Sequence, residues 1–337
     1  MRHLRPETRA PEIIRRPGIE SNKSIFDSPQ ELHTPRVYEI TPVICTRLQS
    51  SKLDDGMCRF YKLIGVLFWA LVIQIPGVAQ TVPQKADPLV VGETFTINSR
   101  ILGETRRINV YTPPGYGAVD GGRVPVLYMP DGGLAEDFLH IAGLVQVSVG
   151  NGTMRPFLLV GIENTQRRRD MTGPTDNAED KKIAPAVGGS DAFRRFIRQE
   201  LMPQVRNRYR TTDETAIIGE SLAGLFVVET FLLEPDMFDT YIAIDPSLWW
   251  NDHKLVNTSS ERLRGRQTGK KSLYFVSSEE KANEAIMMQF ANILKRNTPP
   301  QITWHYEMMP EEKHSTIYHP AALKAFRSVF AVTPATK

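Results

Sequence analysis

Cysteine is almost absent from this chain. The only two, Cys45 and Cys58, lie within the first sixty residues, and neither has the cysteine and histidine neighbours that metal sites use. Neither a metal site nor a disulfide framework is therefore expected. An excess of charge of one sign is also missing, because 41 Lys and Arg against 38 Asp and Glu leave a net charge of +3. Without a dense basic stripe interleaved with aromatic residues, nucleic acid is not an expected partner.

One apolar run stands out, the thirteen residues Leu63–Ile75. A short basic segment, Met57–Lys62, precedes it, and the small residues of Pro76–Ala79 lead to Gln80. A basic start, a short apolar middle and a small-residue exit are typical of a secretory signal peptide. The run is shorter than the roughly 20 residues that span a bilayer. An uncleaved anchor and a buried core helix remain the alternatives, and membrane contact is expected only if the segment stays uncleaved.

The segment before this run, residues 1–56, is rich in Arg, Pro and Ser and has no sustained periodicity. Such a composition buries too little apolar surface to fold. Because a signal peptide begins a chain, Met57 is the expected initiator, and residues 1–56 are expected to be disordered or a mis-annotated extension. The sequence thus predicts an extension at 1–56, a signal peptide at 57–79 and one folded domain at 80–337, secreted or periplasmic.

From Glu93 onward, short apolar runs alternate with helical patterns. Continuous apolar runs such as Val124–Met129 suit strands that are buried on both faces of a sheet. Alternation of this kind over two hundred residues predicts a mostly parallel sheet with helices on both faces. The expected strands are Glu93–Asn98, Arg106–Tyr111, Val124–Met129, Phe157–Ile162, Ala216–Gly219, Tyr241–Ile244, Leu273–Ser277 and Ile302–Met308. The expected helices are Asp191–Arg208, Leu222–Leu233, Glu280–Lys295 and Pro320–Phe330, and Glu163–Ser190 is expected to be a long loop.

The segment Ala216–Leu225 carries the clearest chemical signal. An apolar strand runs into Gly219-Glu220-Ser221 and then directly into a helical pattern. This is the setting of a nucleophile elbow, where a serine on a strained strand-to-helix turn projects beyond an α/β-hydrolase sheet. The motif usually has a second glycine where this chain has Ala223. A serine that merely caps the helix is the alternative, but the strand before it and the helix after it favour a nucleophile at Ser221.

The base of a serine hydrolase with this fold follows the nucleophile and the acid in the chain. Four histidines come after Ser221. His314 is the best candidate, because it lies in the loop between the last expected strand and the last expected helix. His319 is second, whereas His305 falls inside a strand pattern and His253 comes too early.

The acid that orients the histidine is expected at the end of a neighbouring strand. Glu280 in the loop after Leu273–Ser277 fits best, and Glu279 is second. Asp245, at the end of the preceding strand, is a third candidate. Both glutamates could instead form the solvated first turn of the next helix.

The oxyanion hole of such an elbow uses the backbone N–H of the residue after the nucleophile, here Leu222. A second donor is expected from the loop after Val124–Met129, at Gly132 or Gly133, where glycine lets the backbone approach the ester oxygen. A simple turn would look similar.

Several segments together resemble the putative-esterase family of α/β-hydrolases, which includes enterochelin (siderophore) esterases. They are Val126–Gly132, Val160–Asp170, Gly189–Gly224 and Phe238–Trp250, and the resemblance covers most of 93–331. It implies an α/β-hydrolase that cleaves carboxylic esters through an acyl-enzyme, without a metal or organic cofactor, and it suggests small-molecule esters of the siderophore (enterochelin-like) kind as substrates. The family elbow commonly has His before the serine and Gly two after it, whereas this chain has Glu220 and Ala223.

Within that resemblance, four residues are candidates for substrate binding. Arg167 and Arg169 could contact an anionic substrate, because guanidinium groups bind planar anions bidentately. Trp249 and Trp250 could wall the pocket. Structural roles are the alternatives for all four. The rival function is a non-catalytic ligand-binding protein that keeps the fold.

Overall fold

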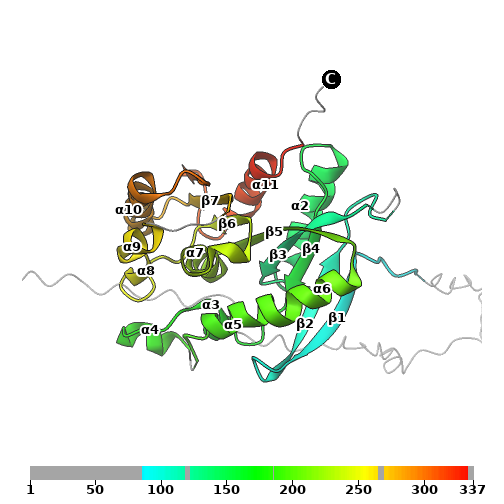
Figure 1. Ribbon diagram of the computed structural model, residues 1–337, viewed down its shortest axis with the longest axis horizontal. Coiled ribbons are helices and arrows are strands. Elements are labelled where there is room, and N and C mark those ends of the chain that lie inside the picture. Colours follow the sequence, from blue (N-terminus) through cyan, green and yellow to red (C-terminus); the bar gives the residue numbers. More distant parts are fainter. Residues whose placement is uncertain (1–85, 118–121, 185, 265–268, 333–337) are drawn as a thin grey trace, which may run out of the picture. The chain divides into compact units, whose positions relative to one another are not determined.

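The computed structural model describes residues 86–117, 122–184, 186–264 and 269–332 (Figure 1). The expected signal peptide at 57–79 and the extension before it lie outside these residues and stay predictions. Within the described ranges, no helix has both the length and the apolar character that a bilayer crossing needs.

The described residues build an eight-stranded sheet with the order β1-β2-β4-β3-β5-β6-β7-β8. The β1–β2 and β2–β4 pairs are antiparallel, and every other neighbouring pair is parallel. The carboxyl ends of the parallel strands therefore meet along one edge, where ligands bind in open α/β sheets. The strands are β1 (Glu93–Ser99), β2 (Glu104–Tyr111), β3 (Val124–Pro130), β4 (Leu158–Ile162), β5 (Thr211–Glu220), β6 (Thr240–Ile244), β7 (Lys271–Ser277) and β8 (Ile302–Met308).

Helices cover both faces of the sheet, as the sequence predicts (Figure 1). Strand β3 shows why, because its side chains alternate: Val126 and Tyr128 belong to one buried apolar cluster, and Leu127 and Met129 to the other. The helices that contribute to the second cluster are α2 (Phe138–Gly150) and α11 (Tyr318–Val329). Those that contribute to the first are α3 (Arg167–Met171), α5 (Ser190–Phe196), α6 (Met202–Arg208), α7 (Leu222–Leu233), α8 (Lys254–Asn257), α9 (Ser259–Leu263) and α10 (Lys281–Asn297).

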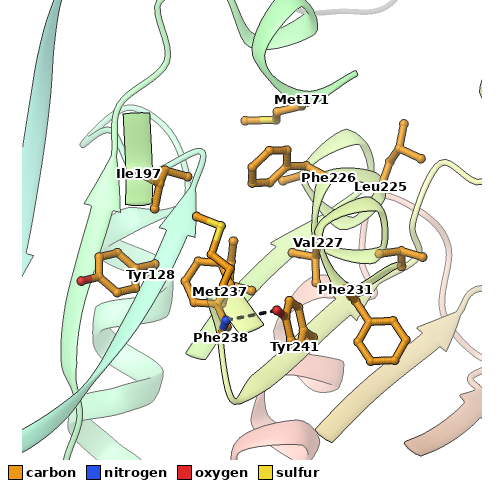
Figure 2. Close-up of a cluster of buried hydrophobic side chains, with 14 of the residues drawn as sticks. Tyr128, Met171, Ile197, Leu225, Phe226, Val227, Phe231, Met237, Phe238 and Tyr241 are labelled. Carbon is orange, nitrogen blue, oxygen red and sulfur yellow. Dashed lines mark hydrogen bonds between the residues drawn. The ribbon is translucent and has the colours of Figure 1, made fainter. Parts of the chain in front are cut away.

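Helix α7 is buried almost all round, and Figure 2 shows its apolar side chains packed among residues of neighbouring elements. Phe226 and Phe231 come from the helix, Tyr128 from β3 and Tyr241 from β6. The hydroxyl of Tyr241 accepts a hydrogen bond from the N–H of Phe238 at 3.1 Å and lies 3.0 Å from the carbonyl oxygen of Pro235. The buried hydroxyl is thus satisfied, as burial of a polar group requires. This packing fixes the helix whose first turn follows Ser221.

Several elements differ from the sequence-based expectations. Helices α2, α8 and α9 were not expected, and the expected long loop contains α3 and α4 (Ala178–Ile183). The expected helix at 191–208 is interrupted by a π-helical turn, Ile197–Leu201, in which the N–H of Met202 donates to the carbonyl of Ile197. Pro203 follows at once and has no N–H to continue a regular α-helical pattern, which accounts for the interruption.

Candidate active site

Ser221 lies between the end of β5 and the start of α7, at the carboxyl edge of the sheet. Its backbone has φ 60° and ψ −119°, a conformation that side chains rarely adopt. The N–H of Ser221 donates to the carbonyl of Ile244 at 3.0 Å, which ties the turn to β6. The strained strand-to-helix turn that the sequence predicts is therefore present, and strain of this kind is common at functional sites.

The tight turn explains which small residues this elbow needs. A Cβ on Gly219 would lie 2.6 Å from the carbonyl carbon of Ala223, so the glycine makes room for the methyl group of Ala223. A Cβ on Gly224 would lie 3.0 Å from the carbonyl oxygen of Ile244 and 3.0 Å from the Cα of Pro246. The close approach of the helix to the loop after β6 thus occurs at Gly224, one residue beyond the usual motif position.

A continuous hydrogen-bonded chain joins the serine to a histidine and a carboxylate. The Oγ of Ser221 lies 3.0 Å from Nε2 of His314, and Nδ1 of His314 lies 2.7 Å from Oδ2 of Asp245. His314 lies in the loop between β8 and α11, as the sequence predicts. Nucleophile, base and orienting carboxylate within hydrogen-bond reach of one another form the arrangement that activates a serine.

The prediction that Glu280 or Glu279 contacts the histidine is wrong, because Asp245 makes the hydrogen bond to His314. Strand β6, which ends directly before Asp245, pairs directly with β5, whereas β7 lies one strand farther from the serine. Both glutamates are exposed, and Glu280 is the residue that precedes helix α10. Glu279 donates its N–H to the carbonyl of Glu312. The two glutamates therefore fit the alternative, in which they form the solvated start of the next helix, α10.

The loop after β7 nevertheless contributes to the site, because it holds the carboxylate of Asp245. Ser278 donates its N–H to Oδ1 at 3.2 Å and its hydroxyl to Oδ2 at 2.7 Å, and Asn283 donates its amide to Oδ1 at 2.7 Å. Burial alone would raise the pKa of the Asp245 carboxyl, but hydrogen bonds from His314 and Ser278 outweigh it and lower the pKa. Asp245 is thus a fixed anion.

The hydrogen bond to Asp245 raises the pKa of His314 above its ordinary value, against the effect of burial, and the Glu220 carboxylate raises it further. His319, the second candidate base, lies 2.9 Å from His140 through their ring nitrogens and stacks on that ring. His305 stacks on Tyr274. These side chains have other partners, so the geometry favours His314 among the candidate histidines.

The donors expected for the oxyanion hole differ in their availability. The N–H of Leu222 is the first of α7, and a helix N-terminus leaves such groups without an intrahelical acceptor. The N–H of Gly132 instead donates to the carbonyl of Ile162 at 3.0 Å, and that of Gly133 to Oε2 of Glu136 at 2.6 Å. A Cβ on Gly132 would lie 2.3 Å from the backbone of Gly161, so packing against β4 accounts for this glycine. The prediction that Gly132 supplies an oxyanion-hole donor is therefore wrong for this arrangement. The N–H of Gly133 can donate to an oxyanion only if the side chain of Glu136 moves away from it.

Glu220, directly before the nucleophile, also faces the base. Its Oε1 lies 3.4 Å from Nε2 of His314. Burial raises the pKa of Glu220 to about 7, against the opposing effects of His314 and Arg167. Among the described residues, the side chain of Glu220 accepts no hydrogen bond, and its one ion-pair contact is with His314. The residue at which this chain departs from the common family elbow is thus part of the site.

Comparison with known proteins agrees with this geometry. A family model described as "Putative esterase" matches residues 99–329, most of the part that carries the sheet. The chain belongs to this esterase family. A solved structure, an IroE-like serine hydrolase from Shewanella oneidensis, is 26% identical with a TM-score of 0.66, over 72% of this chain and 82% of that one. The fold is therefore that of an α/β-hydrolase.

Curated relatives of this esterase-family chain are similar over shorter stretches. Ferri-bacillibactin esterase BesA of Bacillus subtilis is 34% identical over 153 residues, 44% of this chain and 46% of that protein. The siderophore triacetylfusarinine C esterase of Aspergillus fumigatus is 32% identical over 186 residues, 49% of this chain and 58% of that protein. The chain thus spans about half the length of the curated relatives it matches.

The two arginines expected to contact substrate in this esterase-family chain are engaged within the protein. Arg167 forms a bidentate pair with Asp131, with N–O distances of 2.7 and 2.8 Å. Arg169 pairs with Glu104 at 2.7 Å and with Asp170 at 2.7 Å. Arg169 thus has the structural role that was the alternative, and Arg167 reaches the site with its charge already balanced.

The two tryptophans differ from each other. Trp250 is buried, donates its Nε1–H to the carbonyl of Gly173 at 2.9 Å, and lines a cavity of about 250 Å³ beside α7 and α8. That cavity has none of Ser221, His314 and Asp245 in its lining, so it is separate from the candidate active site. Trp249 is 43% exposed and stays a candidate for substrate contact.

Sequence reasoning missed the residues that support the triad. Ser278 and Asn283 hold Asp245, and Glu220 faces His314, yet none was a candidate for such a role. A signal for Glu220 was available, because it stands where the family commonly has histidine. Nothing in the sequence pattern singles out Asn283, which reaches Asp245 only through the packing of α10 against the sheet.

Proposed function

We propose that this chain is a serine hydrolase that cleaves carboxylic esters of small molecules. The observation that carries the proposal is the chain of contacts from Ser221 Oγ to His314 at 3.0 Å and on to the buried Asp245 at 2.7 Å. A strained turn that presents the serine at the carboxyl edge of the sheet supports the same function.

In this mechanism Ser221 attacks the ester carbonyl while Nε2 of His314 takes the hydroxyl proton. Asp245 holds the Nδ1–H tautomer and balances the imidazolium that forms. The N–H of Leu222 donates to the developing oxyanion, and the N-terminus of α7 favours its negative charge. His314 then returns the proton to the leaving alcohol, which leaves an acyl group on Ser221. Water, deprotonated by His314, attacks the acyl-enzyme and releases the acid.

The substrate class is proposed from the relatives. BesA and the Aspergillus enzyme are described as esterases of siderophores, and each shares about a third of its aligned residues with this chain. Siderophore esters are therefore the first natural substrates to test. The catalytic steps above use only groups of this chain and water, and none of them draws on a metal or organic cofactor.

Turnover of p-nitrophenyl butyrate by the purified protein tests this proposal. We expect Ser221→Ala to reduce turnover on the order of a millionfold, because the nucleophile of such a triad cannot be replaced. Far-ultraviolet circular dichroism should be unchanged in the variant. If the alanine variant keeps more than a small fraction of wild-type turnover, Ser221 is not the nucleophile. If the wild type turns over no ester at all, a ligand-binding protein with this fold is the better reading.

We also propose that the hydrolase domain is exported, with residues 57–79 as a cleaved signal peptide. The basic opening, the apolar run and the small-residue exit before Gln80 support export. Expression from Met57 in a bacterial host should give a periplasmic or secreted protein whose N-terminal peptide, identified by mass spectrometry, begins near Gln80. A product that keeps Met57 and stays in the cytoplasm would contradict this proposal without affecting the catalytic one.

A further inference from the structure

The charges around the candidate nucleophile are unbalanced, and this limits which esters the site can accept. The carboxylates that act on His314 or on Glu220 come from four separate segments of the chain. They are Asp131 with Asp137, Glu220, Asp245 and the exposed Glu280. The permanent cation among them is Arg167, whose guanidinium is paired bidentately with Asp131.

During catalysis Glu220 and Asp137 share one permanent cation, Arg167, which is already paired with Asp131. When His314 is protonated, its charge is balanced by Asp245, with which it shares a 2.7 Å contact. Glu136 accepts hydrogen bonds from the N–H groups of Gly133 and Asn164. Glu220 has only the 3.4 Å contact with His314, and the side chain of Asp137 does not cap α2. Arg169 does not balance these carboxylates either, because it pairs with Glu104 and Asp170.

The pKa values of two carboxyl groups near the nucleophile are raised. Burial chiefly, with a contribution from neighbouring carboxylates, raises the pKa of Glu220 to about 7 and that of Asp137 to about 6, against the opposing effect of Arg167 on both and of His314 on Glu220. Burial and the same carboxylates also raise the pKa of Tyr318, whose hydroxyl is buried without a hydrogen-bond partner among the described residues. Neighbouring carboxylates thus act on all three groups, and above pH 7 Glu220 and Asp137 are themselves mostly anionic.

We infer that this hydrolase selects esters that carry no negative charge near the scissile bond, and that Glu220 is the residue chiefly responsible. The inference rests on the proposed function, since it concerns the substrate of the same site. Glu220 lies 3.4 Å from Nε2 of His314, which lies 3.0 Å from Ser221 Oγ, so its carboxylate and the attacking oxygen contact the same ring nitrogen. Among iron(III) siderophores, a tris-catecholate complex is a trianion and a tris-hydroxamate complex is neutral. The site favours the second kind and any uncharged or cationic ester.

Matched synthetic esters with one leaving group test the inference. Mono-p-nitrophenyl glutarate carries a free carboxylate, and its methyl ester is the neutral partner of the same length. The p-nitrophenyl ester of 4-(trimethylammonio)butyrate is the cation, and that of 5,5-dimethylhexanoate is its neutral isostere. We expect kcat/KM, corrected for uncatalysed hydrolysis, to be about tenfold or more lower for the anion than for its neutral partner. The cation should equal or exceed its isostere, and added salt should reduce the discrimination.

The variant Glu220→Gln should narrow the ratio between the neutral and anionic glutarates several-fold. Glu214→Gln is the matched control, because Glu214 lies on the same strand, about 20 Å along β5 at the usual rise per residue, and pairs with Arg155. This control should leave the ratio unchanged.

The pH dependence of the ratio gives an independent readout. Glu220 gains a proton as the pH falls through about 7, so discrimination against the anion should weaken from pH 8 to pH 6. The groups that face Glu220 are His314, Arg167, Asp131, Asp137 and Tyr318. Protonation of His314 lowers both rates alike and cancels in the ratio. In Glu220→Gln the change of the ratio with pH should be smaller.

Equal kcat/KM for the neutral and anionic glutarates in the wild type would overturn the inference and leave the hydrolase intact. A ratio unchanged in Glu220→Gln would overturn the role of Glu220. Absence of turnover for all four esters would instead count against the proposed function.

Discussion

At the scale of single residues, Asp245 makes the carboxylate contact with His314, because the strand before it, β6, is the direct neighbour of β5, which ends directly before Ser221. Sequence spacing favours Glu280, because of its distance from the end of the strand Leu273–Ser277, and this is the sharpest difference from the sequence-based expectation. The carboxylate of Asp245 is also fully buried and accepts hydrogen bonds from His314, Ser278 and Asn283. A buried carboxylate with a defined set of donors is typical of an orienting acid, whereas exposed Glu280 has no such donors.

Two substitutions distinguish these acids. Asp245→Asn should lower kcat on the order of ten-thousandfold, because asparagine cannot balance the imidazolium and favours the wrong tautomer of His314. Glu280→Gln should stay near the wild-type rate, since its side chain is exposed. Turnover of p-nitrophenyl butyrate measures both, with melting temperatures to check folding. A crippled Glu280→Gln beside an active Asp245→Asn would restore the sequence-based assignment.

At the scale of secondary-structure elements, the elbow depends on how closely α7 approaches β5 and β6. Gly219 and Gly224 are the points of contact, and Ala223 fills the space between the helix and the strand. The sequence predicts this element well, because an apolar strand, a small-residue turn and a helix each leave a strong local pattern. The sequence did not predict α2, whose Gly and β-branched residues weaken the helical pattern. Its packing against α11 and the sheet supplies what local propensity lacks.

A pair of glycine substitutions tests this account of the elbow. Gly219→Ala should destabilise the protein by roughly 1–3 kcal/mol, because its Cβ would lie 2.6 Å from the backbone of Ala223. Gly143→Ala on α2 is the control, since a Cβ there meets nothing within 4 Å. It should be neutral or stabilise by up to about 1 kcal/mol, because alanine is the better helix former. Urea denaturation measures both, and equal stability of the two variants would contradict the tight turn.

At the scale of the whole molecule, the sequence predicts the layers of the fold and the order of its strands along the chain. Each of the eight expected strands overlaps one in the structure. Central strands such as β3, β4 and β6 are buried on both faces and leave continuous apolar segments, whereas β1 and β2 show the alternation of partly exposed strands. Contacts between distant segments were harder to predict. The Arg167–Asp131 pair and the contact of Glu220 with His314 join residues far apart in the chain, and no local pattern reports them. Local sequence for this reason did not reveal that Arg167 pairs with Asp131 and Arg169 with Glu104.

The central claim, that Ser221 is a nucleophile activated by His314, is tested most directly by covalent labelling. A fluorophosphonate reacts with an activated serine and stays attached, so intact mass and peptide mapping reveal where it binds. We predict one adduct per wild-type chain, on the peptide that contains Ser221, and no adduct on Ser221→Ala. The variant His314→Ala should react far more slowly, because its serine has lost its base. An unlabelled wild type, or equal labelling of Ser221→Ala, would contradict the account.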